Sequence, residues 1–222
     1  MIKDNRKEII ICALIMLVPV IAGLVLWNRL PDQMVIHWNA NGEADGYAGK
    51  AFAIFGLNAI LYALYAICLI ATNADPKKNN ISRKTFLLCI GSMPLISIFA
   101  NGVTLAAAMG KKIDIDFWST ALISILFIII GNYMPKMRQS YTIGIKLPWT
   151  LESADNWNRT HRFASKIMLI FGLILLANAF IKFMPLAVEG ILFAVVILAP
   201  VVYSYLYYVR NHDASKGEET DE

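Results

Sequence analysis

The sequence predicts an all-α polytopic membrane protein with six transmembrane helices and a short amphipathic cytoplasmic helix before the fifth. Of its 222 residues, 58% are hydrophobic, which is more apolar surface than one soluble core of this size normally hides. Most of these residues gather in six runs, at 9–27, 51–71, 86–109, 117–134, 166–183 and 190–209. About 20 apolar residues match a hydrocarbon core of roughly 30 Å, where an unpaired backbone is too costly, so each run should be a helix.

The first run follows Lys3, Arg6 and Lys7, as the apolar part of a secretory signal would. It is, however, as long as a span, lacks a convincing small-x-small exit site and precedes five more spans. We therefore expect it to be a retained signal anchor.

The distribution of positive charge predicts the orientation. Fifteen of the 20 Lys and Arg residues lie in the amino terminus, 72–85, 135–166 and the tail. The side richer in Lys and Arg faces the cytoplasm, so we expect a multi-pass protein of the cell membrane with both termini cytoplasmic. The net charge of +4 is then a topology signal, and we expect no direct nucleic-acid binding.

The first outer loop, 30–50, reads LPDQMVIHWNANGEADGYAGK. Pro31, the Asn-Gly pair at 41–42 and the Asp-Gly pair at 45–46 are turn formers, and 34–38 permits a short extended piece. The loop should therefore be compact. It offers a candidate extracytoplasmic binding surface that is made by His37, Trp38, Asn39 and Asp45. Tyr47 follows closely in the sequence. Alternatively, Trp38 anchors the loop at the membrane interface and His37 satisfies a local backbone group.

The segment 135–166, called the motif loop below, divides into two parts. Residues 144–149 should not be helical, because Gly144 is permissive and Pro148 disfavours the helical region for Leu147. A helix should then begin after Ser153, with Asp155 and Arg159 as a favourable i,i+4 pair. We expect this amphipathic helix to run into the fifth span, with its Trp and basic residues at the level of the lipid headgroups.

The remaining segments indicate little chemistry. The 72–85 loop reads as a solvated connection, and the tail, 210–222, should be disordered. We expect an N-terminal two-span unit, 1–72, that includes the 30–50 loop, and a four-span unit, 86–209, that includes the motif loop. The three cysteines lie in or at the start of spans without a CxxC spacing, so neither disulfides nor a metal site is expected.

Polar groups within the spans are mainly amides and hydroxyls, which usually hydrogen-bond between helices. They are Asn58, Tyr62, Tyr65, Asn101, Thr104, Asn178, Tyr203 and Ser204. Charges lie at span ends, which disfavours an ion-coupled transporter. The sequence has no HExxH, no GxSxG and no phosphate-binding loop, so we expect neither an enzyme nor a cofactor.

Two stretches together resemble a known family. The 30–50 loop resembles the extracytoplasmic signature of an uncharacterised bacterial membrane domain, and 131–166, GNYMPKMRQSYTIGIKLPWTLESADNWNRTHRFASK, resembles the signature of the SdpI family, the bacterial cannibalism-toxin immunity proteins. The hallmark of the SdpI family is a Gly-(Ile/Leu)-Arg-Thr-Pro-Trp-Thr-like run followed by a Trp and an Arg-Phe-Ala cluster. Lys146 and Leu147 depart from it, and Lys lacks the bidentate fork of Arg.

The resemblance implies a non-enzymatic role in toxin immunity and signal transduction. A membrane-active peptide toxin would act at the outer loop or spans, and a transcriptional repressor would be held at the cytoplasmic motif. The implied binding residues are Gly144, Lys146, Pro148, Trp149, Thr150, Trp157 and Arg162. For the tryptophans, anchoring in the bilayer is the alternative, and Arg162 could instead pair with a carboxylate or a lipid phosphate. A different reading of the span asparagines and prolines is a transporter or exporter of small amphiphilic molecules.

Overall fold

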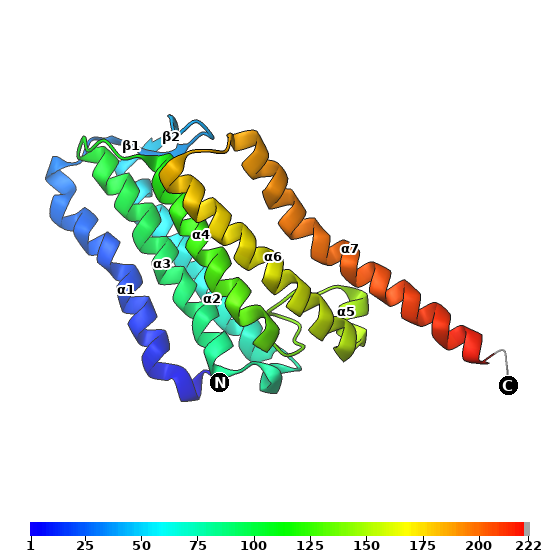
Figure 1. The fold of residues 1–222 in the computed structure, drawn as a ribbon. Coiled ribbons are helices and arrows are strands. Elements are labelled where there is room, and N and C mark those ends of the chain that lie inside the picture. The colour runs from blue at the N-terminus through cyan, green and yellow to red at the C-terminus, as the bar shows by residue number, and fades with distance from the viewer. Residues whose placement is uncertain (220–222) are drawn as a thin grey trace. The chain divides into compact units, whose positions relative to one another are not determined.

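The predicted fold class is confirmed: within residues 1–219, which the computed structural model describes, six helices are long and apolar enough to cross a membrane. Side chains are described through residue 211. The six helices are α1 (Arg6–Leu26), α2 (Leu57–Ala74), α3 (Arg83–Ala108), α4 (Ile115–Tyr133), α6 (Ala154–Ile181) and α7 (Leu186–Glu219) (Figure 1).

Shorter elements lie between and beside these helices. A five-residue helix, α5 (Pro148–Glu152), precedes α6, and a π-helical stretch, η3 (Phe52–Gly56), leads into α2. Single 3-10 turns are η1 (Lys3–Asn5), η2 (Trp27–Arg29), η4 (Lys78–Asn80) and η5 (Met134–Lys136). Two strands, β1 (Gln33–Trp38) and β2 (Ala44–Gly49), form the hairpin, the name used below for residues 33–49.

The chain forms two compact units. The first contains Met1–Ala74 and Arg83–Trp118, and the second contains Asp75–Ser82 and Ser119–Glu222. The sequence suggested a division between residues 72 and 86, whereas α3 packs against α1 and α2 in the first unit. The loop before α3, Asp75–Ser82, belongs instead to the second unit, which also contains the motif loop.

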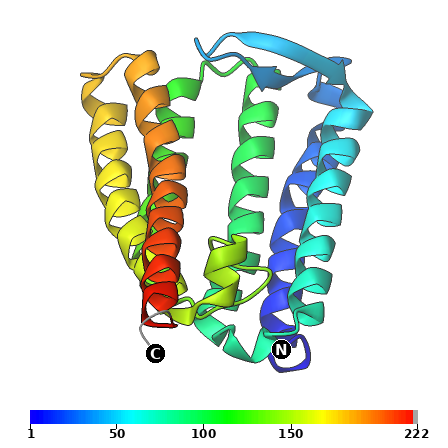
Figure 2. The same cartoon turned by 90° about the vertical axis from the view of Figure 1, so that its right-hand side faces the viewer.

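In the first unit, the hairpin lies over the ends of the helices next to it (Figure 2). One of its faces is apolar and buried. Met34 of β1 is buried with Leu30, Ala53 and Ile54, and Leu105 of α3 packs against this cluster. The extended piece predicted at 34–38 is thus confirmed as part of β1. The second strand was not predicted, because Asp45, Gly46 and Gly49 are poor strand formers, and antiparallel pairing with β1 makes the difference.

A reciprocal amide pair joins α2 to α3 in the same unit. Asn58 Nδ2 donates to Asn101 Oδ1 at 2.9 Å, and Asn101 Nδ2 donates back to Asn58 Oδ1 at 3.2 Å. Tyr62 and Tyr65 donate to backbone carbonyls of α1. Interhelical hydrogen bonding, the expected role of these polar residues, is therefore what they do here.

In the second unit, glycines let α4 and α6 approach closely. A Cβ built at Gly172 would lie 2.8 Å from Ile128 Cγ1 and 3.0 Å from the Ser124 carbonyl oxygen. Ser165 of α6 donates to the Gly131 carbonyl of α4. The core alongside is apolar, with Phe171, Leu175 and Val196 buried between α6 and α7 and Phe127, Met168 and Leu192 packed around them. Small residues at such crossings are typical of membrane helix pairs.

Helix α7 continues to Glu219, although the sequence indicated a disordered tail from residue 210. Residues 210–219 contain neither proline nor an apolar run, and Ala, Lys and Glu among them are good helix formers that extend a helix already nucleated upstream. The rest of the predicted tail, 220–222, lies outside the described residues.

Candidate functional site

The hairpin presents His37 and Asp45 side by side on its exposed face. The His37 Nδ1–H donates to Asp45 Oδ1 at 2.6 Å, and both side chains are largely open to solvent. Tyr47 of β2 is 59% exposed, and Trp38 is half-buried. His37, Asp45 and Tyr47 are exposed to solvent, so another molecule can reach their polar groups, which makes this face a candidate recognition surface.

Gly46, on the neighbouring strand, leaves the space that the His37 side chain occupies. The register pairs the two residues directly, at an irregularity in the ladder. A Cβ built at Gly46 would lie 2.7 Å from His37 Cβ, closer than two side chains can approach. The strand partner of His37 therefore has to be a glycine.

Asn39, also predicted to bind, shapes the turn between the strands. Its Oδ1 accepts from the backbone nitrogens of Asn41 and Glu43 at 2.9 and 3.0 Å. Its backbone nitrogen also donates to the Glu43 carbonyl at 2.8 Å. An asparagine that bonds its own backbone two residues on is a turn-forming device, so Asn39 acts by holding the other residues in place.

In the motif loop, the prediction that 144–149 is entirely non-helical is wrong at its end. Pro148 and Trp149 begin α5, while Leu147 stays extended at φ −120° and ψ 153°, as the following proline requires. Proline is favoured in the first turn of a helix, where its missing N–H has no partner to lose. The predicted cap is confirmed, because Ser153 Oγ accepts from the Asn156 backbone nitrogen at 3.1 Å and α6 begins there.

Thr150 closes the turn between residues 145 and 150. Its hydroxyl donates to the Ile145 carbonyl at 2.8 Å and accepts from the Leu147 backbone nitrogen at 2.9 Å. The side chain is fully buried. Thr150 therefore organises the loop from inside and presents nothing to a partner.

Trp157 and His161 form a buried stack on α6. Their ring centroids lie 4.1 Å apart with an interplanar angle of 21°. Trp157 Nε1 donates to the Met137 carbonyl at 2.8 Å, and His161 Nε2 accepts from the Ile145 backbone nitrogen at 3.1 Å. His161 Nδ1 lies 2.8 Å from the Trp157 carbonyl, to which it must donate. With one ring nitrogen donating and the other accepting, the imidazole is neutral.

Gly144 fits against this stack because it has no side chain. Its φ is +117°, a conformation that favours glycine. A Cβ there would lie 2.6 Å from His161 Nε2 and 2.7 Å from the Trp157 ring. Two independent constraints thus require glycine at this position.

Asp75, from the loop before α3, was missed by the sequence reasoning, which assigned that loop no chemistry. Its Oδ2 accepts from the backbone nitrogens of Tyr141 and Thr142 at 2.9 and 3.0 Å and from the Thr142 hydroxyl at 2.7 Å. Its other oxygen accepts from the Lys77 backbone nitrogen. Asp75 is 3% exposed. A lone carboxylate in a polar loop gives no sequence signal for such a role.

Gln139 makes a second connection inside the loop. Its Nε2 donates to the carbonyls of Thr150 and Leu151 at 2.9 and 2.7 Å, which fixes α5 against the segment leaving α4. The backbone carbonyl of Gln139 accepts from Asn80 Nδ2 at 2.8 Å. The motif loop and the 75–82 loop therefore fold as one hydrogen-bonded body.

Ser204 of α7 binds two residues of the motif loop. Trp149 Nε1 donates to Ser204 Oγ at 2.9 Å, and Asn156 Nδ2 donates to the Ser204 carbonyl at 3.0 Å. The Trp149 ring also packs edge-on against Tyr205. Trp149 is therefore anchored to α7 by protein contacts.

Of the residues predicted to bind in the motif loop, Lys146, Pro148 and Arg162 are exposed. Lys146 Nζ donates to the Thr142 carbonyl. Gly144, Thr150 and Trp157 instead build the loop from within. Within the residues that the structure describes, no three His, Cys, Asp or Glu side chains gather into a set that could hold a metal ion.

Residues 136–208 match the SdpI/YfhL protein family, and residues 14–62 match DUF1648, a domain of unknown function. The chain is 28% identical over 207 residues to the immunity protein SdpI of Bacillus subtilis (strain 168), an alignment that covers 92% of this chain and 97% of the relative. No solved structure matches.

The two matched regions contain the two sites described above. The SdpI/YfhL match runs from Lys136 in the motif loop to Tyr208 within α7, and the DUF1648 match includes the whole hairpin. The chain is a multi-pass integral membrane protein, and its resemblance to the SdpI family is confirmed by the match of residues 136–208 to the family and by the similarity to the immunity protein SdpI.

Proposed function

We propose that this chain is a membrane immunity protein that protects the cell producing it from a membrane-active peptide toxin. The observation that carries the proposal is the similarity to the immunity protein SdpI, which extends over 97% of that relative. Because the alignment extends over nearly the whole of both chains, a shared role explains the similarity better than a shared helical scaffold alone does. Six apolar helices supply the membrane location that the role needs.

The proposal places the hairpin outside the cell and the motif loop inside. The distribution of Lys and Arg supports this orientation. Three spans, α2 to α4, lie between the two elements in the chain, so they should emerge on opposite faces. Labelling of single cysteines, Asp45→Cys and Glu152→Cys in a chain free of its native cysteines, with a membrane-impermeant thiol reagent should modify only the hairpin position in intact cells.

The toxin would meet the exposed face of the hairpin. His37, Asp45 and Tyr47 are exposed there, and they offer an aromatic surface beside an imidazole and carboxylate pair. Aromatic residues with polar ends are the groups that dominate protein recognition surfaces. The apolar face under Met34 fixes the hairpin on its unit, so the surface is presented without a large loss of entropy on binding.

Survival under toxin challenge tests this role. Cells that lack their own immunity protein and express this chain should survive a cannibalism-type peptide toxin, and the double variant His37→Ala/Asp45→Ala should lose about tenfold in the tolerated toxin concentration, about 1.4 kcal/mol of binding. Gln33→Ala, an exposed position on β1, is the matched control and should protect fully. Equal survival of cells with and without the chain, across a panel of such toxins, would overturn the proposal.

A second part of the proposal is signal transduction through a cytoplasmic repressor, which rests on the family resemblance. The exposed groups of the motif loop, Lys146, Pro148 and Glu152, are those that a soluble protein can reach. Trp149 is packed against α7, so it is not a suitable contact. Toxin would change the exposure of this loop only if it bound two conformations of the chain differently.

Site-specific crosslinking tests that second part. A photoreactive group at Glu152→Cys should capture a cytoplasmic repressor protein more strongly in toxin-treated cells, whereas Lys84→Cys, at the start of α3, should capture none. Identical yields with and without toxin would refute the switch and leave the immunity role standing. The transporter alternative is not favoured by the contacts of the span asparagines, since Asn58 and Asn101 bind each other.

A further inference from the structure

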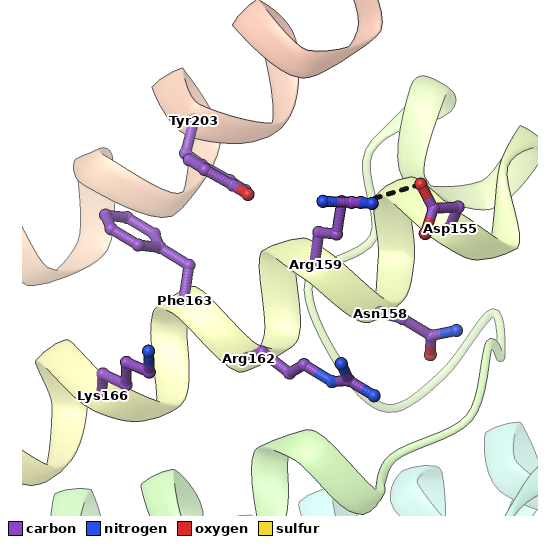
Figure 3. Close-up of a pocket in the computed structure, with 7 residues that line it drawn as sticks. All are labelled: Asp155, Asn158, Arg159, Arg162, Phe163, Lys166 and Tyr203. Carbon is purple, nitrogen blue, oxygen red and sulfur yellow. Dashed lines mark hydrogen bonds and ion pairs between the residues drawn. The ribbon is translucent and has the colours of Figure 1, made fainter.

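A basic groove lies between α6 and α7, just after the motif loop. It has a volume of about 390 Å³ and is lined by Asp155, Asn158, Arg159, Arg162, Lys166 and the Phe163 and Tyr203 pair (Figure 3). The positions of Arg159, Arg162 and Lys166 differ by three and four residues, which puts them on one face of α6. The lining of the groove therefore includes three cations and one carboxylate, all on α6.

The carboxylate is already engaged. Asp155 Oδ2 accepts from Arg159 Nε at 2.9 Å and also from the Tyr207 hydroxyl. Among the residues that the structure describes, Arg162 and Lys166 have no hydrogen bond or ion pair. In the view of Figure 3, Arg162 leaves α6 on the side opposite to Arg159, and Lys166 lies further along the helix, beyond Phe163. The described part of the groove thus carries two positive charges that no hydrogen bond or salt bridge engages, although Arg162 acts electrostatically on the Asp155 carboxylate.

An apolar groove of about 590 Å³ continues from the basic one along α7. It shares Phe163 and Tyr203 with the basic groove, and these two rings stack at 4.6 Å with an interplanar angle of 16°. The rest of its lining is aliphatic and runs from Leu206 back to Ile191. From Ile191 to Leu206 the helix rises by fifteen steps, about 22 Å, more than the roughly 15 Å of one leaflet of hydrocarbon.

We infer that the joined grooves hold one anionic phospholipid, with its phosphate on Arg162 and Lys166 and an acyl chain along α7. A cationic site that opens directly into an apolar groove long enough to cover one leaflet matches a ligand with a negative head and a long tail. A free phosphate would leave the apolar groove empty. A zwitterionic headgroup carries a positive charge of its own, which Arg162 and Lys166 would repel. The bilayer supplies the ligand at high local concentration.

Lipid retention measured by native mass spectrometry tests the inference. The full chain, released from micelles containing phosphatidylglycerol or phosphatidylcholine, should retain one phosphatidylglycerol. Each basic residue near an anionic surface contributes about fivefold to affinity, so Arg162→Gln/Lys166→Gln should weaken retention about 25-fold. Lys84→Gln/Arg138→Gln removes the same charge at exposed positions outside the groove and should retain lipid normally.

A second pair of variants tests the apolar part. Ala194→Phe fills the apolar groove and should displace the acyl chain, whereas Ala187→Phe adds the same ring on α7 outside the lining and should not. Unchanged thermal unfolding shows that each variant is folded. The inference is overturned if the groove variants retain phosphatidylglycerol like their controls, if phosphatidylcholine is retained equally, if inorganic phosphate alone displaces the lipid, or if the bound mass is a peptide.

Discussion

The carboxylate of Asp75 binds Thr142 twice, accepting from its backbone nitrogen at 3.0 Å and from its hydroxyl at 2.7 Å. A residue that follows α2 therefore holds a loop that follows α4, 67 positions later. Because Asp75 is buried, these hydrogen bonds are shielded from water and each contributes more than a surface contact would.

Asp75→Asn should destabilise the second unit. The amide NH₂ would replace one acceptor oxygen and face a backbone donor, which leaves buried donors without partners. We expect a loss of about 2 kcal/mol, measured as a lower midpoint in thermal unfolding of the purified chain. Glu152→Gln, an exposed carboxylate of α5, should leave the midpoint unchanged, and an equal effect of both variants would contradict the role given to Asp75.

Gly144→Ala should be more damaging than its size suggests. The new methyl would meet His161 and Trp157 at 2.6–2.7 Å, in a backbone conformation that alanine avoids. Overpacking and backbone strain together should cost about 3 kcal/mol. Gly91→Ala on α3, where nothing lies within 4 Å of the new methyl, is the control and should be neutral or stabilising. Unfolding of the two variants at the same temperature would count against this packing.

Trp157→Phe should separate hydrogen bonding from packing. The variant keeps an aromatic ring against His161 but leaves the Met137 carbonyl, the acceptor at 2.8 Å, without its buried donor. The expected cost is about 1–2 kcal/mol in unfolding free energy. Trp118→Phe, at a position 53% exposed, should have little effect. A tryptophan that merely anchored the loop in the headgroup region would give the opposite ranking.

The Asn58 and Asn101 pair should show strong coupling in a double-mutant cycle. Either single change to Leu leaves a buried amide without its partner, while the double change removes both amides. The double variant should therefore lose less stability than the sum of the singles, with a coupling of about 1 kcal/mol. Strict additivity would mean that the amides face a solute pathway instead of each other.

Local spacing made much of the fold predictable. The six apolar runs predicted the six long helices, and Ser153 with Asp155 in the following turn predicted the start of α6, because such signals act over a short stretch of chain. Asp155 and Arg159 also pair as expected, at 2.9 Å. Each of these features depends on residues a few positions apart.

The tertiary contacts of the motif loop could not be predicted in the same way. Thr150 and Trp157 were expected on a binding surface, yet their polar atoms are used by carbonyls within the loop. Ser204, 55 positions after Trp149, is a common residue whose partner depends on how α7 packs. Sequence patterns identify the residue types that a buried network needs, while the pairing depends on contacts distant in the chain.

Membrane potential under toxin challenge tests the proposed immunity most directly. Cells without their own immunity protein would be loaded with a potential-sensitive dye and exposed to a membrane-active cannibalism-type peptide, with and without this chain. Immunity predicts that cells expressing the chain hold their potential while control cells depolarise. Equal depolarisation in both, with the chain shown to be present in the membrane, would contradict the proposed function.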